Sequence, residues 1–191
     1  MKRFTLKALA AAMLLAARAS ACAAEDGEAR AAGSDQLVAY FSRSGNTRVI
    51  AGQLQRELGA DLFEILPAEP YPADYEQTVE QARQERDRGF EPALKARVPN
   101  LAGYQTIFLG FPIWGETTPP IVRTFLRNYD LSGKTLRPFI THGGYGPGNS
   151  MSVLRSHAPR AQIADPFVME ADQERRTMTQ VRGWLATIQR A

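Results

Sequence analysis

The sequence feature that most constrains the fold is an apolar run that leads through a short polar loop into a helix. Residues 37–41 are apolar and rich in strand formers, so they predict a buried strand. The loop after them, Ser42-Arg-Ser-Gly-Asn-Thr47, carries three hydroxyl side chains, a glycine and an amide, and apolar residues at helical spacing follow it. Such a loop can bind a phosphate through backbone N–H groups, hydroxyls and the helix dipole. It also fits an ordinary capped turn with Ser44 or Asn46 as the N-cap.

Strand and helix patterns alternate through the rest of the chain. Such alternation predicts an α/β domain in which helices connect the strands of a parallel sheet. We expect five strands, at residues 37–41, 61–66, 106–111, 136–141 and 162–169.

The helical segments between the strands differ in character. Residues 74–88 are highly charged with a narrow apolar stripe, and we interpret them as a surface helix with a solvated charged face. Residues 89–104 form a long loop that we expect to pack on the surface or to border a site. Pro119-Pro120 begins a third helix, and residues 151–157 form a fourth. Asp172 is expected to cap the last helix.

Three unusual loops follow strands: residues 42–47, 112–120 and 142–150. In an open parallel sheet, ligands bind beyond the carboxyl ends of the strands, so all three loops are expected at one edge. The second loop contains Trp114, and the third contains Tyr145 among four glycines. The set is suited to a flat heterocycle that carries a phosphate. Alternatively, Trp114 anchors the core and Tyr145 is a plain surface residue.

These residues resemble the flavodoxin-like family, and more specifically its long-chain bacterial branch of exported flavodoxins. The resemblance extends from Leu37 to Ile188, nearly the whole globular part. It is carried by Ser42-Arg-Ser-Gly-Asn-Thr47, Tyr71-Pro-Ala-Asp-Tyr75, Phe108-Leu-Gly-Phe-Pro-Ile-Trp-Gly115, Leu131-Ser-Gly-Lys134 and Thr141-His-Gly-Gly-Tyr-Gly-Pro-Gly148.

The resemblance implies a flavodoxin-like three-layer sandwich over residues 35–191, with a five-stranded parallel sheet of order 2-1-3-4-5 and bound FMN. It assigns a phosphate loop and two loops around the flavin, and it implies no catalytic residue and no metal. His142 is expected to hydrogen-bond its loop more readily than to act in catalysis. The implied FMN-binding residues are Ser42, Ser44, Gly45, Asn46 and Thr47 in the first loop, Pro112, Ile113, Trp114 and Gly115 in the second, and Thr141, Gly143, Gly144, Tyr145 and Gly148 in the third.

The chain departs from the family at the second loop. A second tryptophan often follows the first in this branch, and here Gly115 stands instead, a residue that can adopt a positive φ. Glu116 is the only acid in the second and third loops, whereas many electron-carrier flavodoxins are strongly acidic there. We therefore expect a higher reduction potential than that of acidic carriers.

Three functions remain open from the sequence. The first is electron transfer by an FMN protein in the cell envelope, with a redox partner protein or a small-molecule electron donor or acceptor. The second is an NAD(P)H- or quinol-linked FMN-dependent quinone reductase. The third is a non-redox module that binds another phosphorylated ligand or a partner protein.

The N-terminus has the three-part layout of a secretory signal, so residues 1–22 are expected to be a signal peptide and residues 23–34 a disordered linker. A basic segment precedes residues 8–17, an apolar run too short to span a bilayer as a mature helix. Small residues then surround Cys22, which offers either an ordinary cleavage site or a lipidated cysteine that anchors the protein to a membrane. The expected location is the periplasm of a bacterium or, for a lipoprotein, a membrane surface.

Composition excludes several classes of function. Cys22 is the only cysteine, so the globular part has no disulfide, thiolate metal site or cysteine nucleophile. Four of the 23 basic residues and none of the 20 acidic residues lie in the signal, so the mature chain is close to neutral. Nothing in this balance indicates nucleic-acid binding.

Overall fold

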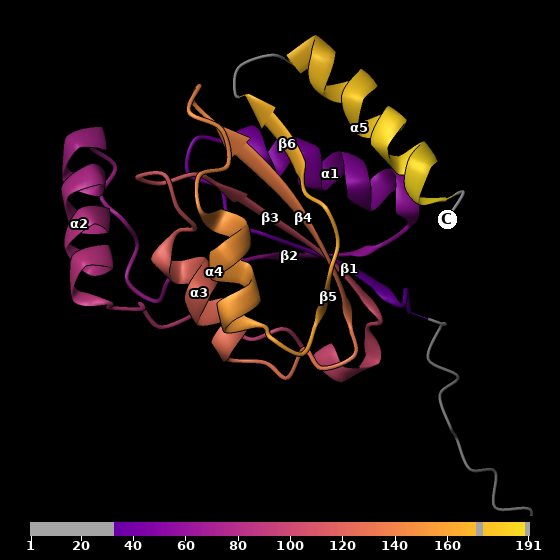
Figure 1. Cartoon of the computed structure of the whole chain (residues 1–191), viewed down its shortest axis with the longest axis horizontal. Coiled ribbons are helices and arrows are strands. Elements are labelled where there is room, and N and C mark those ends of the chain that lie inside the picture. Colours follow the sequence, from indigo (N-terminus) through magenta and orange to yellow (C-terminus); the bar gives the residue numbers. More distant parts are fainter. Residues whose placement is uncertain (1–32, 171–173, 190–191) are drawn as a thin grey trace, which may run out of the picture. The chain divides into compact units, whose positions relative to one another are not determined.

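The computed structural model describes residues 33–170 and 174–189 (Figure 1). The expected signal peptide, Cys22, nearly all of the expected linker and Asp172 lie outside the described residues. The described elements, in chain order, are β1 (Gln36–Tyr40), α1 (Asn46–Leu58), β2 (Asp61–Glu64), α2 (Tyr75–Arg88), the 3₁₀ turn η1 (Leu101–Gly103), β3 (Thr106–Pro112), α3 (Pro120–Arg127), β4 (Thr135–His142), α4 (Ser150–His157), β5 (Gln162–Ile163), β6 (Phe167–Glu170) and α5 (Glu174–Ile188).

The strands form one parallel sheet in the order β2-β1-β3-β4-β5, which confirms the predicted 2-1-3-4-5 topology. The predicted single strand at 162–169 is wrong, because the structure divides it into β5 and β6, both paired with β4. Pro166 lies in the gap between these strands. A proline has no N–H to donate to a β-ladder, and this accounts for the interruption.

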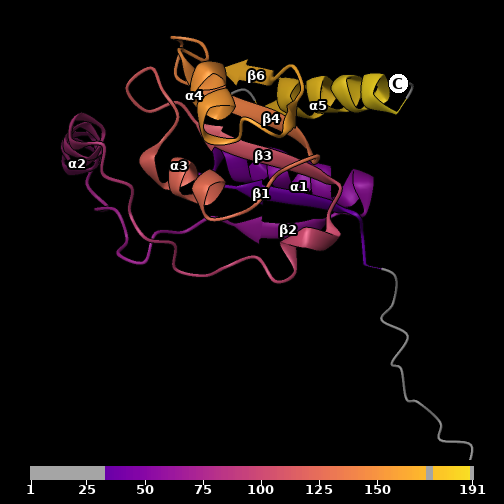
Figure 2. The same cartoon turned by 60° about the horizontal axis from the view of Figure 1, so that its bottom comes forward.

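Helices lie on both faces of the sheet, as expected for a three-layer sandwich (Figure 2). A hydrophobic cluster fills the interface on each face. One face packs on α1 and α5, where Ile50 and Val181 are fully buried. The other packs on α3 and α4, where Phe125 and Leu154 are fully buried. Within the described residues, no helix is long and apolar enough to cross a membrane.

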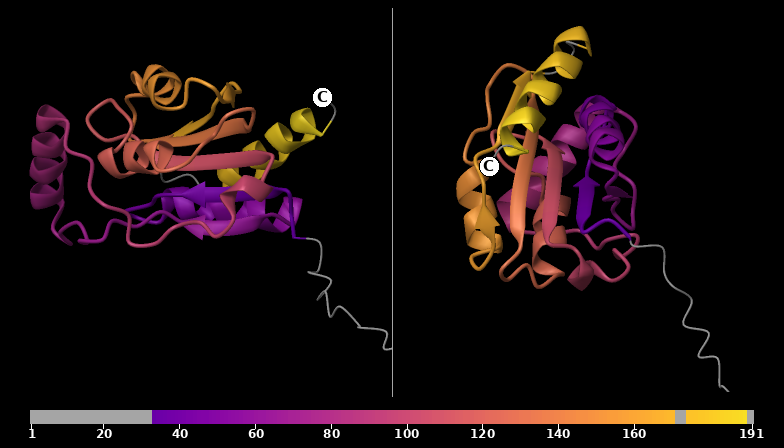
Figure 3. Two further views of the ribbon diagram at one scale, coloured as in Figure 1. Left: turned by 90° about the horizontal axis from the view of Figure 1, so that it is seen from below. Right: turned by 90° about the vertical axis from the view of Figure 1, so that its right-hand side faces the viewer.

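Helix α2 does not join either layer. It stands apart from the sheet, beyond the carboxyl ends of the strands (Figure 3). The Asp74 side chain caps its start by accepting a hydrogen bond from Gln77 N at 2.9 Å, and Gly89 ends it in the left-handed conformation. The long loop at residues 89–104 covers part of the sheet instead, since Val98 and Leu101 are buried in the same cluster as α3 and α4. This agrees with the expectation that the loop packs on the surface or borders a site.

Candidate functional site

The loops after β1, β3 and β4 are joined by direct hydrogen bonds. Ile113 N, in the second loop, donates to the Thr141 carbonyl at 2.8 Å. The hydroxyls of Thr47 and Thr141 bond to each other at 2.9 Å, and both residues are almost fully buried. The N-terminus of α1 is therefore tied to the end of β4, and the three loops form one unit at the carboxyl edge of the sheet.

The first loop is closed by its own serine. Ser42 Oγ accepts a hydrogen bond from Gly45 N at 3.1 Å, and Gly45 has a φ of 99°. Helix α1 begins at Asn46 with Gly45 as N-cap and no side-chain cap, so the prediction of Ser44 or Asn46 as the N-cap is wrong. The physical reason is that Ser42 already holds the turn from the strand side. Ser44 is left exposed at the start of the helix.

The second loop begins with a tight turn at its aromatic residue. Trp114 N donates to the Thr117 carbonyl at 3.0 Å, and Thr117 N donates back to the Trp114 carbonyl at 3.3 Å. Gly115 and Glu116 between them have φ values of 57° and 62°, two left-handed residues in succession. Gly115 adopts the positive φ that the sequence analysis allowed for it. The one at Glu116 was not foreseen, because a glutamate carries no sequence signal for a conformation that side chains disfavour.

Trp114 belongs partly to the core and partly to the site. Its ring meets Phe41 edge-on at 5.1 Å and Tyr71 edge-on at 4.9 Å between centroids. The Tyr71 hydroxyl in turn donates to Glu85 on α2 at 2.8 Å. Burial, together with the bond to Glu85, raises the pKa of Tyr71. This cluster fixes the tryptophan and ties α2 to the domain.

The third loop packs against the second through a glycine. Asn149 N donates to the Glu116 carbonyl at 3.0 Å, and a Cβ added at Gly148 would lie only 1.9 Å from that carbonyl oxygen. His142 Nδ1 accepts a hydrogen bond from Gly144 N at 3.1 Å, the loop-bonding role expected for it. Tyr145 is 84% exposed and does not line the cavity between the loops.

A cavity of about 600 Å³ lies between the three loops and α2, and we call it the edge cavity. It brings together eight of the fourteen predicted FMN-binding residues: Ser44, Asn46, Pro112, Ile113, Trp114, Gly115, Thr141 and Gly143. The other six do not line it. Ser42, Gly45 and Thr47 shape the first loop behind it, and Gly144, Tyr145 and Gly148 lie in the part of the third loop that leads away from it.

Helix α2 forms the far wall of the edge cavity. The sequence predicted the helix but not its place at the site. Tyr75, Val79 and Ala82, its apolar stripe, line the cavity with Arg83 and Arg86. The interpretation of this helix as a solvated surface element is therefore wrong for one of its faces. The signal was the stripe itself, since Tyr75 and Val79 are 64% and 46% exposed and need a partner other than the sheet.

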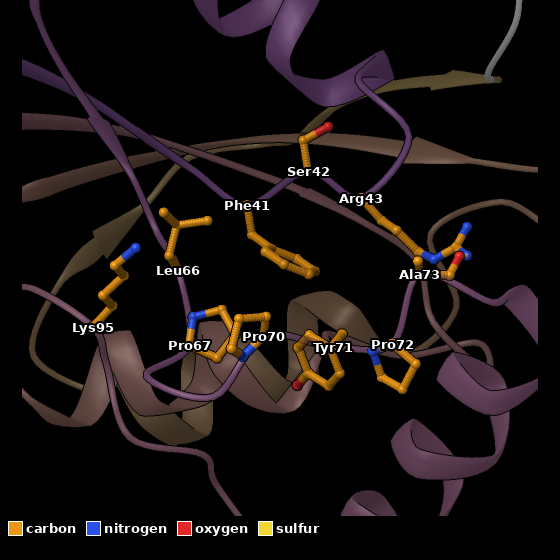
Figure 4. A pocket seen from close by; sticks show the side chains of 10 residues that line it. All are labelled: Phe41, Ser42, Arg43, Leu66, Pro67, Pro70, Tyr71, Pro72, Ala73 and Lys95. Atoms are coloured by element: carbon orange, nitrogen blue, oxygen red, sulfur yellow. Dashed lines mark hydrogen bonds between the residues drawn. The ribbon is translucent and has the colours of Figure 1, made fainter.

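Arg43 separates the edge cavity from a smaller one of about 470 Å³, which Figure 4 shows from close by. Its guanidinium donates to the Ala73 carbonyl at 3.1 Å and lies 5.3 Å from the ring centroid of Tyr75. The smaller cavity is lined by the rings of Phe41 and Tyr71 and by Lys95. Arg43 thus fastens the first loop to the start of α2.

Comparison with known proteins agrees with this architecture. The sequence profile of the family described as Flavodoxin matches residues 35–188. The chain belongs to the flavodoxin family. Membership supports the FMN cofactor that the sequence predicts, whereas the exported long-chain branch stays a prediction. No curated protein matches the chain.

Two solved structures from the genus Bacteroides are similar in sequence as well as fold. A candidate flavoprotein from Bacteroides eggerthii is 34% identical, with a TM-score of 0.69 over 80% of this chain and 96% of that one. A candidate flavoprotein from Bacteroides uniformis is 30% identical, with the same TM-score over 78% of this chain and 99% of that one. A flavoprotein from Lactobacillus acidophilus, crystallised with FMN, is 22% identical with a TM-score of 0.59 over 75% and 97% of the two chains, and shares the fold.

Proposed function

We propose that this flavodoxin-family protein binds FMN in the edge cavity and transfers electrons in the cell envelope of a bacterium. The observation that carries the proposal is the composition of that single cavity. It combines the N-terminus of α1 with Trp114 and the backbone of the third loop. The helix N-terminus is suited to a phosphate, the tryptophan to a flat ring, and the loop backbone to the polar edge of that ring.

The residues present are suited to FMN. Ser44 and Asn46 line the cavity at the first turn of α1, where backbone N–H groups and the dipole favour a phosphate. Trp114 offers an apolar surface held from behind by two aromatic rings. FMN, when bound, supplies the redox chemistry, and the protein binds it, orients it and sets its electrostatic surroundings.

Charge and proton donation in the cavity come from this chain's own side chains. Arg43, Arg83 and Arg86 line it and favour negative charge inside it. Because His142 Nδ1 accepts the Gly144 N–H, the proton of a neutral His142 ring lies on Nε2. His142 also lines the cavity, so it can act as a hydrogen-bond donor to a bound group.

A second candidate function is an FMN-dependent reductase that takes electrons from NAD(P)H or a quinol and acts on quinones. The α2 wall favours it, because Tyr75 and Val79 offer a second apolar surface opposite the loops. A flat organic substrate is suited to such a surface, whereas a carrier that docks a protein needs no enclosing helix.

One experiment tests both functions. The mature protein is purified, incubated with excess FMN, desalted, and its visible spectrum is recorded. NADH or NADPH is then added without air. Retained flavin absorbance that stays unchanged with either nucleotide supports the carrier, and rapid bleaching supports the reductase. A protein that retains no FMN refutes both.

Export is a separate part of the proposal and rests on the N-terminal sequence alone. The expected result is a periplasmic or membrane-attached mature protein that begins near Cys22. Fractionation of cells that express the native chain, with a Cys22→Ala variant as control, measures this. Loss of membrane attachment in the variant identifies a lipid anchor, and an uncleaved cytoplasmic chain contradicts export.

A further inference from the structure

A third cavity, of about 560 Å³, adjoins the edge cavity, and we call it the arginine pocket. The two cavities share Arg86 and Gly115 in their walls, so a molecule in one lies next to the other. The arginine pocket is formed where the turn of the second loop meets α3, α4 and the end of the third loop. Its remaining lining residues are Glu116, Thr117, Arg123, Gly148, Asn149 and Val153.

Arg123 is held rigidly in the wall of this pocket. Its Nε donates to the Thr118 carbonyl at 3.1 Å, and its Nη2 donates to the Thr117 hydroxyl at 3.0 Å. Both acceptors are neutral, and among the described residues no carboxylate forms an ion pair with Arg123. Burial lowers the pKa of Arg123 because it removes water from around the charge; Glu91 opposes this effect, and Arg86 and Arg127 add to it.

Arg86 approaches the same pocket from α2. Its Nη1 lies so close to Gly115 that a Cβ added there would be 2.2 Å away. Its ion pair is a long one, 3.4 Å to its neighbour Asp87. Glu116 is the one carboxylate among the residues that line the pocket, and it is exposed. Glu91 is engaged by Arg127 at 3.1 Å.

Two guanidinium groups therefore face a recess that contains too little negative charge to neutralise them. We propose that the arginine pocket binds the carboxylate or phosphate group of a small anionic molecule whose remaining part reaches the edge cavity. Guanidinium groups bind both anions through charge-assisted, often bidentate, hydrogen bonds. The inference rests on the proposed function only in making that molecule a ligand of the FMN site; anion binding itself needs no FMN.

The test is a titration of inorganic phosphate, and separately of acetate, followed by ¹H–¹⁵N NMR. It is run on the FMN-saturated protein and on the protein without FMN. We expect saturable shifts of the Asn149 amide and of Arg123 Nε–H with one dissociation constant. The Arg123→Gln and Arg86→Gln variants should each raise that constant about tenfold or more. Tighter binding of phosphate or of acetate identifies which anion the pocket prefers.

Arg88→Gln is the matched control, because it removes one positive charge from the last turn of α2, the helix of Arg86, at an exposed position outside the pocket. It should change the dissociation constant less than about twofold, as expected for a screened, exposed charge. Since Arg123→Gln also removes two hydrogen bonds to the turn, Arg86→Gln provides the result that does not depend on the turn. Thermal unfolding of each variant checks that it is folded.

Three results would overturn the inference. One is an equal dissociation constant in Arg86→Gln and Arg88→Gln. Another is an anion response confined to the amides of residues 44–47, which places the anion on the first loop. The third is loss of the Arg86-dependent binding when FMN is added, which makes the pocket part of the cofactor site. A protein that binds no FMN refutes the proposed function, while the titration without FMN still judges the pocket.

Discussion

Gly148 controls the contact between the second and third loops, and replacing it by alanine should open the site. Two terms contribute to the cost. Its φ of 53° lies in the left-handed region, where a side chain costs about 1 kcal/mol. The new Cβ would also lie 1.9 Å from the Glu116 carbonyl oxygen, a backbone atom that cannot rotate away. The loops must therefore separate.

The second term can be sized from known effects. Overpacking costs about 1–3 kcal/mol, and loss of the Asn149–Glu116 hydrogen bond adds about 0.5–1.5 kcal/mol. The chain offers a control two residues away, because Gly146 has a φ of 72° and a Cβ there would meet nothing within 4 Å. Because both variants share the left-handed cost, Gly148→Ala should destabilise the fold by about 1.5–4.5 kcal/mol more than Gly146→Ala.

Urea denaturation followed by circular dichroism measures this difference, and flavin fluorescence titration measures the FMN dissociation constant. Because Gly115 and Trp114 lie in the displaced turn, we expect FMN to bind at least about tenfold more weakly to Gly148→Ala, which corresponds to about 1.4 kcal/mol. Gly146→Ala should bind FMN within about threefold of the native affinity. Equal stability and equal affinity of the two variants would show that the loops do not depend on this contact.

Three further predictions concern other parts of the site. Gly45→Val should abolish FMN binding, because a valine cannot easily adopt the φ of 99° that Gly45 has in the first loop. Gly59→Val, at the far end of α1, should lower stability but retain FMN in the same fluorescence titration. Retained affinity in both variants would contradict the placement of the phosphate. Thr47→Val should lower the free energy of unfolding by about 1–3 kcal/mol, because it leaves the buried Thr141 hydroxyl unpaired. In urea denaturation, the double variant with Thr141→Val should lose less than the sum of the losses in the two single variants. Additive losses would disprove the pairing. The folded-state pKa of Tyr71 lies above its ordinary value of 10.0, so its contribution to stability is complete below about pH 10 and is lost as the pH rises further. Above about pH 10 the free energy of unfolding of the native protein should therefore fall by up to about 1.4 kcal/mol per pH unit more than that of Tyr71→Phe. Identical slopes in the two proteins would refute the assignment.

The sheet and the three loops could be predicted from the sequence because their signals are local. An apolar run such as residues 106–111 identifies a strand, and the loop that follows it reaches the carboxyl edge by the rules of parallel sheets. The division of the last strand was also readable, since Pro166 lies within the run that we assigned as one strand. The proline indicates a break, whereas the hydrophobic pattern of residues 162–169 indicates one continuous strand.

The parts that could not be predicted depend on hydrogen bonds within the loops that the residue types alone do not indicate. Gly45 is the N-cap of α1 in place of Ser44 or Asn46, because the Ser42 hydroxyl accepts a hydrogen bond from Gly45 N and closes the turn from the strand side. Glu116 takes a left-handed conformation because the turn between Trp114 and Thr117 requires two such residues in succession. Serine is not specific to loop closure and glutamate is not typical of a left-handed turn, so a single sequence does not indicate either feature.

The position of α2 is the largest of these differences, and it changes the chemistry expected of the site. The loops themselves carry one acid, Glu116, and we inferred a comparatively high reduction potential from that scarcity alone. The structure adds Arg83 and Arg86 from α2, and Arg43 is fastened to its first turn. Positive side chains around a cavity favour the more negative state of whatever it holds, so they act in the same direction as the missing acids. Ion pairs with Glu80 and Asp87 on the same helix offset part of this effect. A helix that the sequence presents as a charged surface element therefore places two arginine side chains in the wall of a cavity whose loops carry a single acid.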